Sequence, residues 1–452
     1  MNANMIAFDQ DILTRSIDLE RHCFGEFSMA NVQANTVMED QSNVEVAARN
    51  TLFLGVYDGH GGADASLYVL NNLFGNLLRF AHANDNSVIT AENLRNAVLD
   101  TERGFLEYVE ANIDRMQQIG KIGSCCLAGA VWKDKLYVAN LGDSRAVIGS
   151  VINRTLQTTQ LTTDHNCNNQ VIRQELHALH PDDPTIVMER NGAWRVKGII
   201  MVSRSIGDAY LKRPDFSLLD TFPQYEPPVP PPFTRGVLSA EPEIVTRDIA
   251  DTDKFVIFAS DGLWEHVSNE EACEIVHRNP RHGIAKRILS HALERAARRY
   301  DISYREMQTF PTGRENLGRR TFHDDISVIV VFLGKKTIFR KSVENMSYRG
   351  SHAQGLPSDF TGSRLLDSKF KGLKDRIKKQ FKGSSSKGNS SRTAEHEIVS
   401  FIDRVKLLDM GMGDTSKNRT DRDEVAENKG DQSSRPKSRW NKLKKKFTPK
   451  KH

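Results

Sequence analysis

Five acidic residues stand next to short apolar segments, where buried strands are expected to begin or end. They are Glu39, Asp40, Asp58, Asp261 and Asp324. Two carboxylates about 4 Å apart repel by about 4 kcal/mol at an effective dielectric constant of about 20, so such a cluster is stable only when it is protonated or bound to cations. Ligand sets made of oxygen atoms favour Mg²⁺ or Mn²⁺ over zinc. The alternative is that these acids are separate surface caps and turns, which is the usual place of aspartate.

The segment 52–62 places two candidate groups at one turn. Residues 52–56 are apolar and suit a buried strand, and Asp58 follows almost directly. Three of the next four residues are glycines, which let the backbone turn tightly and approach a ligand. Apolar residues at helical spacing over 67–78 predict a helix that packs back on the strand. We therefore expect Asp58 and His60 to face the opening.

Hydrophobic periodicity predicts the elements that must position these acids. The predicted segments are an edge strand in 24–35, a helix over 90–109, a hairpin of 124–132 and 136–148, a helix after a capping box at 268–271, a helix through 284–296 and a closing strand at 326–333. The strands cluster and the helices come in pairs, which favours a layered α+β domain with an antiparallel β-sandwich at its centre over an alternating βαβ chain.

Charge divides the chain near Gly334. Residues 1–334 carry 33 basic and 44 acidic side chains, a net charge of −11, whereas residues 335–452 carry 30 and 14, a net charge of +16. We therefore expect a domain boundary near Gly334, followed by a basic tail at 335–452. The tail is rich in serine and lysine, a composition typical of disordered segments.

Composition also indicates the cellular compartment. The chain has five cysteines and no Cys-x-x-Cys pair, which suits neither a disulfide framework nor a zinc site. This favours a reducing, intracellular location in the cytoplasm or the nucleus. The first residues lack the basic and apolar regions of a secretory leader, and no apolar run approaches the roughly 20 residues that span a bilayer.

Two segments of the tail carry apolar residues at helical spacing among lysines. They are residues 369–382, with Phe370, and residues 440–447, with Trp440. Each pattern predicts a basic amphipathic helix, which favours peripheral contact with an anionic membrane such as the plasma membrane. The alternatives are a solvated charge run or a nuclear-import signal. Nucleic-acid binding is not indicated, since no aromatic platform accompanies the lysines.

Seven motifs in order resemble those of metal-dependent type 2C serine/threonine protein phosphatases, and such an ordered set is far more specific than a lone Asp-Gly-His-Gly. They are Met38-Glu39-Asp40, Asp58-Gly59-His60-Gly61-Gly62, Gly123-Ser124, Gly142-Asp143-Ser144-Arg145, Ser203-Arg204-Ser205-Ile206-Gly207-Asp208, Ser260-Asp261-Gly262-Leu263-Trp264-Glu265 and Asp324-Asp325-Ile326-Ser327-Val328. Residues 24–30, 207–212 and 323–325 resemble a plant subgroup. The resemblance covers residues 24–334 and implies that they form the catalytic domain, after an N-terminal segment at 1–23. It also implies a central antiparallel β-sandwich flanked by helix pairs, with a dinuclear metal site at one end.

The resemblance also implies roles for single residues. The implied metal ligands are Glu39, Asp40, Asp58, Gly59, Asp143, Asp261, Glu265 and Asp324. Asp58 would bridge two Mg²⁺ or Mn²⁺ ions, and Asp143 with Glu265 would hold a third ion next to Asp261. A metal-activated water between the first two ions would attack phosphorus directly. His60 would protonate the leaving serine or threonine oxygen, although a lone histidine is more often structural.

The implied activity is hydrolysis of phosphoserine and phosphothreonine on proteins, so the implied partners are phosphoprotein substrates, and we expect a monomer. One position departs from the family. Many relatives carry a phosphate-binding arginine where this chain has Asn35, so the alternative is an inactive binding module with the same fold. Asn35→Arg is expected to lower the KM for small phosphate esters. Arg204 is interpreted either as a buried ion-pair partner or as a catalytic group.

Overall fold

The computed structural model describes residues 11–22, 24–47, 51–82, 88–217, 234–314, 318–334 and 346–350. All of them belong to the first of two units of the chain, residues 1–387, and the second unit lies outside the described residues. The predicted basic segments of the tail and the proline-rich residues 227–232 also lie outside them.

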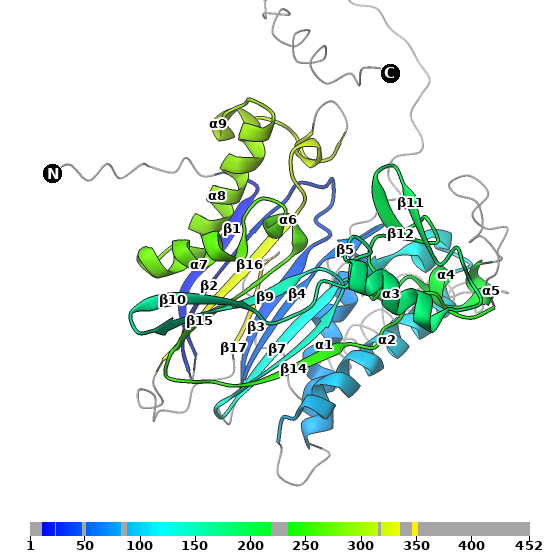
Figure 1. The fold of residues 1–452 in the computed structure, drawn as a ribbon, viewed down its shortest axis with the longest axis horizontal. Helices are drawn as coiled ribbons and strands as arrows, with labels where there is room; N and C mark the ends of the chain where they lie inside the picture. Colours follow the sequence, from blue (N-terminus) through cyan, green and yellow to red (C-terminus); the bar gives the residue numbers. More distant parts are fainter. Residues whose placement is uncertain are drawn as a thin grey trace, which may run out of the picture. The chain divides into compact units, whose positions relative to one another are not determined.

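Two six-stranded antiparallel sheets form the centre of the domain (Figure 1). The first has the order β1 (Thr14–His22), β2 (Gly25–Val32), β16 (Ile326–Leu333), β15 (Asp253–Ala259), β9 (Arg145–Ile152), β10 (Thr155–Gln160). The second has the order β14 (Glu243–Asp248), β8 (Lys135–Leu141), β7 (Cys126–Trp132), β4 (Thr51–Tyr57), β3 (Gln41–Ala47), β17 (Met346–Arg349). Alternate apolar residues such as Phe27 and Met29 on β2 and Leu52 and Leu54 on β4 are buried in one core, which confirms the predicted sandwich.

Helix pairs cover the outer faces of the sheets. α1 (Asp64–His82) and α2 (Ala91–Asn112) pack on the second sheet, and α7 (Asn269–Arg278) and α8 (Ile284–Arg299) pack on the first (Figure 1). The side chain of Thr90 caps α2, and Ser268 caps α7 through the predicted capping box. Among the described helices, none combines the length and the apolar character needed to cross a membrane.

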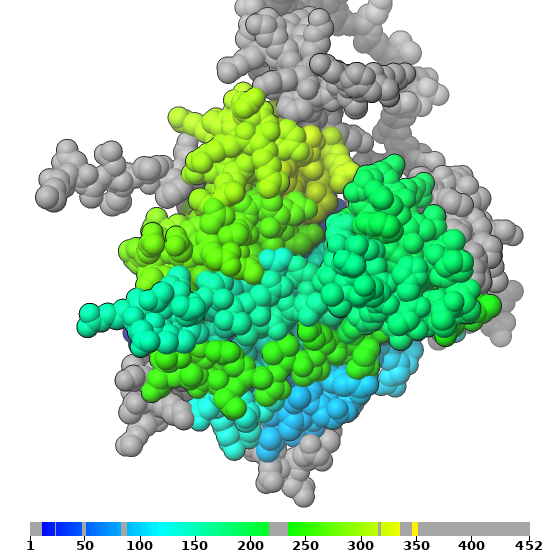
Figure 2. Space-filling view, viewed as in Figure 1, coloured from blue at the N-terminus to red at the C-terminus, as the bar shows by residue number. Residues whose placement is uncertain are grey.

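The remaining elements are short. They are η1 (Gln117–Lys121), α3 (Gln170–Leu179), α4 (Ala209–Lys212), α5 (Pro214–Ser217), α6 (Asp261–Trp264), α9 (Tyr304–Met307), η2 (Arg319–Thr321), the hairpin β11 (Val187–Arg190) and β12 (Ala193–Val196), and the small sheet of β13 (Ile206–Gly207), β6 (Gly123–Ser124) and β5 (Gly59–His60). α3 and the hairpin share a separate apolar core with Leu211 and Val237. Figure 2 shows this green region as a lobe on the side of the molecule.

Two predicted strands differ from the structure. The strand in 24–35 is not an edge strand, because the polar segment β1 pairs along it and becomes the edge. Residues 136–148 are not one strand but β8 and β9, which lie in different sheets. Gly142 makes the turn between them with φ +94°, and a Cβ there would lie 2.3 Å from the Cys125 sulfur, so this position requires glycine.

The sheets also extend beyond residues 24–334. β1 lies before this range and pairs with β2, and β17 lies after it and pairs with β3. The boundaries of the catalytic domain and of the tail therefore stay a prediction.

Candidate active site

The strand register brings the candidate acids to one end of the sandwich. Tyr57, the last residue of β4, pairs with Gln41, the first of β3, so Asp58 lies beside Asp40 at the ends of these strands. On the other sheet, Ala259 at the end of β15 pairs with Val328 near the start of β16. Asp261 therefore lies near Asp324, and the two sheets present their acids at the same end.

The carboxylates at this end are close enough to perturb one another. Burial raises the pKa of Asp58 well above its usual range, and the charges of Asp261 and Asp40 raise it further. The pKa of Asp261 is likewise raised well above its usual range by burial and then by Asp143 and Asp324. A cluster that resists ionisation in this way is chemically suited to bind a cation, since a cation favours the charged carboxylates.

Asp143 lies on the turn between β8 and β9, and the thiol of Cys125 lies beside its carboxylate. Ligand atoms of Asp58, Cys125 and Asp143 lie within 4.8 Å of one another, so this group could hold a metal ion. Asn166 donates from Nδ2 to Oδ2 of Asp143 at 2.6 Å, and the Cys125 sulfur lies 3.4 Å from Oδ1. Burial raises the pKa of Asp143, and burial followed by the charge of Asp143 raises the pKa of the Cys125 thiol.

Asp325, the residue directly before β16, holds the loop that carries Glu39. The buried carboxylate of Asp325 accepts hydrogen bonds from the backbone N–H groups of Ala34, Asn35 and Glu39 at 2.6, 2.9 and 2.7 Å. Burial, followed by the charges of Asp325 and Asp324, raises the pKa of Glu39 to about 7. Asp325 thus fixes the backbone of a candidate ligand without being one of the predicted ligands.

Asp40 and Gly59 are held by backbone and hydroxyl groups. The Ser260 hydroxyl donates to Asp40 Oδ2 at 2.7 Å and accepts from the Ser327 N–H at 2.9 Å, which joins β15 and β16 to the acid. Burial and then Asp325 raise the pKa of Asp40 well above its usual range. The Gly59 N–H donates to the carbonyl of Glu39 at 3.2 Å, so the Asp58 turn is tied to the acidic loop.

Three donors contact the carboxylate of Asp324, and one of them is the Asp325 N–H, which donates to Oδ1 at 2.8 Å. Asn35 donates from Nδ2 to Oδ1 at 3.1 Å, and Arg320 forms an ion pair with Oδ2. Burial raises the pKa of Asp324, and the Arg320 charge opposes this shift. Arg320 is therefore a cation at the acidic cluster that was absent from the predicted site.

Glu265 follows the short helix α6. Burial and then the charge of Asp324 raise the pKa of Glu265, and Glu265 in turn raises that of Asp261. Its side chain is 51% exposed, so it lies on the solvent side of the cluster.

His60 faces a buried partner. Its Nε2 lies 2.9 Å from Oδ2 of Asp208, whose side chain is 1% exposed, whereas that of His60 is 30% exposed. Burial is the largest single influence and lowers the pKa of His60, but the charge and hydrogen bond of Asp208 raise it together with the charges of Glu39 and Asp143, and the net shift is upward. The imidazole is therefore biased toward its charged, proton-donating form.

The structure thus brings all the predicted site residues to one end of the sandwich. Sequence reasoning missed Asp208, Asp325, Arg320 and Cys125 as neighbours of this site. Asp208 and Asp325 did lie inside recognised motifs, and the second acid of Asp324-Asp325 was the available signal. Arg204 forms an ion pair with Glu175 and donates to a backbone carbonyl, which is the structural interpretation of that residue.

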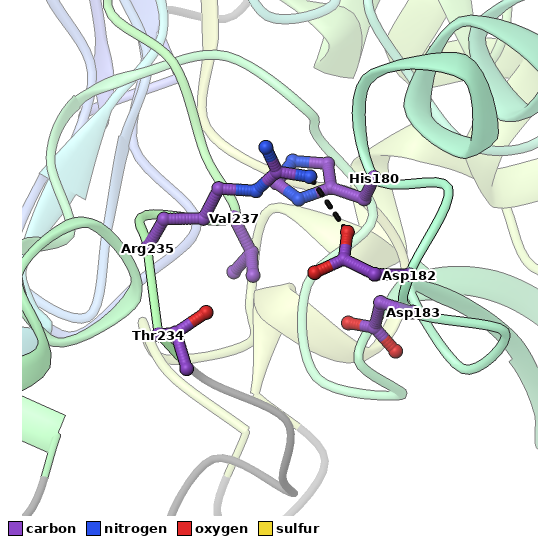
Figure 3. A pocket seen from close by; sticks show the side chains of 6 residues that line it. All are labelled: His180, Asp182, Asp183, Thr234, Arg235 and Val237. Carbon is purple, nitrogen blue, oxygen red and sulfur yellow. Dashed lines mark hydrogen bonds and ion pairs between the residues drawn. The ribbon is translucent and has the colours of Figure 1, made fainter.

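A small pocket on the lobe is separate in character from the acidic cluster (Figure 3). It is lined by His180, Asp182, Asp183, Thr234, Arg235 and Val237. Arg235 donates to Asp182 at 2.8 Å and to the carbonyl of Leu179 at 2.7 Å, and Lys197 pairs with Asp183 at 2.8 Å. Each of the two aspartates that line the pocket is therefore paired with a basic side chain, so a bound cation is not needed to balance their charge.

Known proteins share this sequence and fold. The sequence profile described as Protein phosphatase 2C matches residues 20–301. The chain is 48% identical over 355 residues to "Probable protein phosphatase 2C 43" of Oryza sativa subsp. japonica, and 48% identical over 359 residues to "Probable protein phosphatase 2C 68" of Arabidopsis thaliana; each match covers 78% of this chain and 89% of the relative. The "Crystal structure of serine-threonine phosphatase 2C from Toxoplasma gondii" has a TM-score of 0.50 at 17% identity, covers 71% of this chain and 99% of that chain, and shares the fold.

Proposed function

This chain belongs to the protein phosphatase 2C family and is a metal-dependent protein serine/threonine phosphatase, and we propose that the acidic end of its β-sandwich is the active site. The observation that carries the proposal is that strand ends of both sheets bring carboxylates together around Asp58, whose ligand oxygen lies within 4.8 Å of ligand atoms of Cys125 and Asp143. The hard oxygen donors of these carboxylates fit Mg²⁺ or Mn²⁺, and binding such ions would relieve their mutual repulsion.

Two ions, with a third beside them, are proposed to bind this cluster. The ligands would be Glu39, Asp40, Asp58, Gly59, Asp143, Asp261, Glu265 and Asp324, with Glu39 and Asp40 acting through waters. When bound, such ions activate a water for attack on phosphorus and neutralise charge on the phosphoryl oxygens. Asp325 and Ser260, which adjoin β16 and β15 of the first sheet, hold the Glu39 backbone and the Asp40 carboxylate in place.

The chain's own general acid is proposed to be His60. It lies two residues from Asp58, is partly exposed and is biased toward its charged form. A charged imidazole can donate a proton to the serine or threonine oxygen as the phosphorus–oxygen ester bond breaks. Asn35 motivates the alternative of an inactive binding module, but nothing supports that alternative better than the enzyme, since the acids of the predicted site are retained and grouped.

The substrates, the oligomeric state and the cellular location are also part of the proposal. The substrates are phosphoproteins, and the enzyme is proposed to act as a monomer in the cytoplasm or the nucleus. The basic tail, net charge +16, is proposed to add peripheral contact with anionic membrane. These statements depend on composition and on the tail sequence.

The decisive experiment compares Asp58→Asn with Asp248→Asn in the full-length protein. Asp248 is an exposed acid that pairs with Lys135, so its substitution controls for loss of a carboxylate. Asp58→Asn should lower hydrolysis of a phosphothreonine peptide in Mg²⁺ by more than about 100-fold, because several kcal/mol of metal-derived stabilisation would be lost. Full activity of the native protein after exhaustive chelation would refute the metal-dependent site.

A further inference from the structure

Three two-residue strands place His60 beside the segment 206–208. In this small sheet β6 lies between β5 and β13, and both His60 and Gly207 pair with Gly123. The residue after Gly207 is Asp208, so its side chain reaches the imidazole across Gly123. A Cβ on Gly123 would lie 2.2 Å from Asp208 Oδ2 and 2.4 Å from His60 Nε2, so only glycine leaves room for the contact.

The Asp208 carboxylate is buried and its contacts converge on one oxygen. Oδ2 accepts from the Ser205 hydroxyl at 2.6 Å and meets His60 Nε2 at 2.9 Å. Oδ1 has no hydrogen-bond partner within the described part of the chain, although it is buried. Burial of a carboxylate costs free energy unless the group is paired, and here a candidate catalytic histidine is one of its partners.

The backbone that carries Asp208 is held in an unusual conformation. Asp208 has φ 51° and ψ 44°, the left-handed region that residues other than glycine rarely adopt. Its N–H donates to the carbonyl of Ile122 at 3.0 Å. The buried Glu102 of α2 accepts from the Gly207 N–H at 2.8 Å and from Lys212 Nζ at 2.7 Å. Several elements therefore maintain a strained conformation, as is common at functional sites.

We infer that Asp208 is a positioning residue that fixes the ring orientation and the tautomer of His60 for proton donation. The inference depends on the proposed role of His60. A carboxylate only accepts, so Nε2 carries a hydrogen toward Asp208 and the transferable proton lies on Nδ1. Nδ1 has no hydrogen-bond partner among the described residues, and the 30% exposed ring can meet a substrate there.

In the hydrolysis of the phosphate ester, each bond that breaks and each proton that moves is accounted for. The oxygen of the attacking water forms the new bond to phosphorus, and the ester bond between phosphorus and the serine or threonine oxygen breaks with its electron pair left on that oxygen. Nδ1 of His60 supplies the proton that makes the leaving oxygen an alcohol. The water's proton passes to solvent, from which the imidazole is reprotonated. Asp208 neither gains nor loses a proton in this sequence.

The test varies the leaving group. A phosphothreonine peptide requires protonation of its leaving oxygen, whereas p-nitrophenyl phosphate releases a stable anion. Asp208→Asn should lower kcat for the peptide by about 10²-fold or more and change kcat for p-nitrophenyl phosphate far less, since general acid catalysis contributes about 10²–10⁴-fold. His60→Gln should show the same selectivity, and the double variant should lose little more than either single one. Asp215→Asn, an exposed acid seven positions further on, is the matched control that should match the native protein.

Two further measurements keep the inference falsifiable if Asp208→Asn folds poorly. Gly123→Ala keeps both side chains but places a methyl group between them, and it should reproduce the leaving-group selectivity. Nitrogen-15 NMR of the native protein should show hydrogen on Nε2 of neutral His60. Hydrogen on Nδ1 instead, or an equal loss on both substrates in Asp208→Asn, would overturn the positioning role alone. Absence of selectivity in His60→Gln would overturn the proposed role of His60 as well.

Discussion

At the residue scale, Arg320 pairs with the carboxylate of Asp324, which is also a proposed ligand of a cation. Arg320 pairs with Asp324, four residues further along the chain, and offsets part of the cluster's charge. Arg320→Gln should therefore tighten Mg²⁺ binding up to about fivefold, since a partly exposed ion pair contributes about 0–1 kcal/mol. Calorimetric titration measures the affinity. Arg298→Gln removes a pair of the same spacing, with Glu294 on the exposed side of α8, and should leave it unchanged. Weaker binding in Arg320→Gln would mean that the guanidinium organises the site.

A second residue-scale prediction concerns Asn35. Its amide lies 3.1 Å from Asp324, beside the acids, where a guanidinium could reach a bound phosphate. Asn35→Arg should lower the KM for small phosphate esters and leave kcat near its native value, because bidentate pairing with phosphate adds ground-state and transition-state binding alike. Steady-state kinetics on p-nitrophenyl phosphate measures both constants. A raised KM would show that Arg320 repels a second cation at this position.

Single residues were predictable from the sequence only when strand ends marked them. Asp58, Asp261 and Asp324 each adjoin an apolar segment, so their shared edge could be expected. Asp208 contacts a residue 148 positions away, and Asp325 holds a loop 291 positions away. These partners depend on how short strands and loops meet in space. No local periodicity reports such contacts.

At the element scale, one carboxylate holds the loop at 34–39. Asp325 accepts three backbone N–H groups there, and hydrogen bonds to a charged group each contribute about 1.5–3 kcal/mol. Asp325→Ala should therefore lower the free energy of unfolding by about 3–5 kcal/mol and weaken Mg²⁺ binding, because Glu39 and Asp40 lose their fixed backbone. Urea unfolding and calorimetry measure these effects. Asp248→Ala, which removes an exposed acid paired with Lys135, is the control for loss of an acid. Native affinity in Asp325→Ala would mean that the loop is held by other contacts.

Elements with strong local signals were predicted, and those without them were not. Thr90 and Ser268 cap α2 and α7 where the sequence placed helix starts. β1 was missed because its residues Thr14–His22 are mostly polar and partly exposed, as suits an edge strand. The sequence predicts a single strand over 136–148, because the turn at Gly142 interrupts the apolar pattern for only a few residues.

At the scale of the whole molecule, the acidic cluster links stability to pH. The raised pKa values of Asp58 and Asp261, and that of Glu39 at about 7, mean that the metal-free folded state binds more protons than the unfolded state. Stability from these groups is present at low pH and is lost as pH rises through the folded pKa values. His22 acts in the opposite direction, since its pKa of about 4 costs stability as pH falls below its ordinary value of about 6.5. From about pH 6.5 to 8 the contribution of His22 fades, and His60, whose pKa is raised, loses stability in the same direction as the carboxylates as pH rises.

In that range the metal-free protein should melt at lower temperature as pH rises. With saturating Mg²⁺ the slope should vanish or reverse, because metal binds the deprotonated carboxylates and stabilises the folded state. Thermal unfolding in chelator and in Mg²⁺ at matched ionic strength measures both slopes. Equal slopes in the two conditions would mean that the cluster does not bind the ion. Asp58→Asn should flatten the metal-free slope, whereas Asp248→Asn should not.

The charge division of the chain predicts where this activity acts. Each lysine or arginine near an anionic leaflet adds about 1 kcal/mol of attraction, and two weak anchors on one chain reinforce each other. The full-length protein should therefore sediment with vesicles that contain anionic lipid, and less so as salt rises. Phe370→Glu with Trp440→Glu should release it, because the apolar faces of both predicted helices would be lost. Ser385→Glu with Ser391→Glu changes the charge equally but removes no apolar side chain. Equal release by both double variants would reduce the tail to a polybasic run; no binding at all, with nuclear accumulation in cells, would favour an import signal.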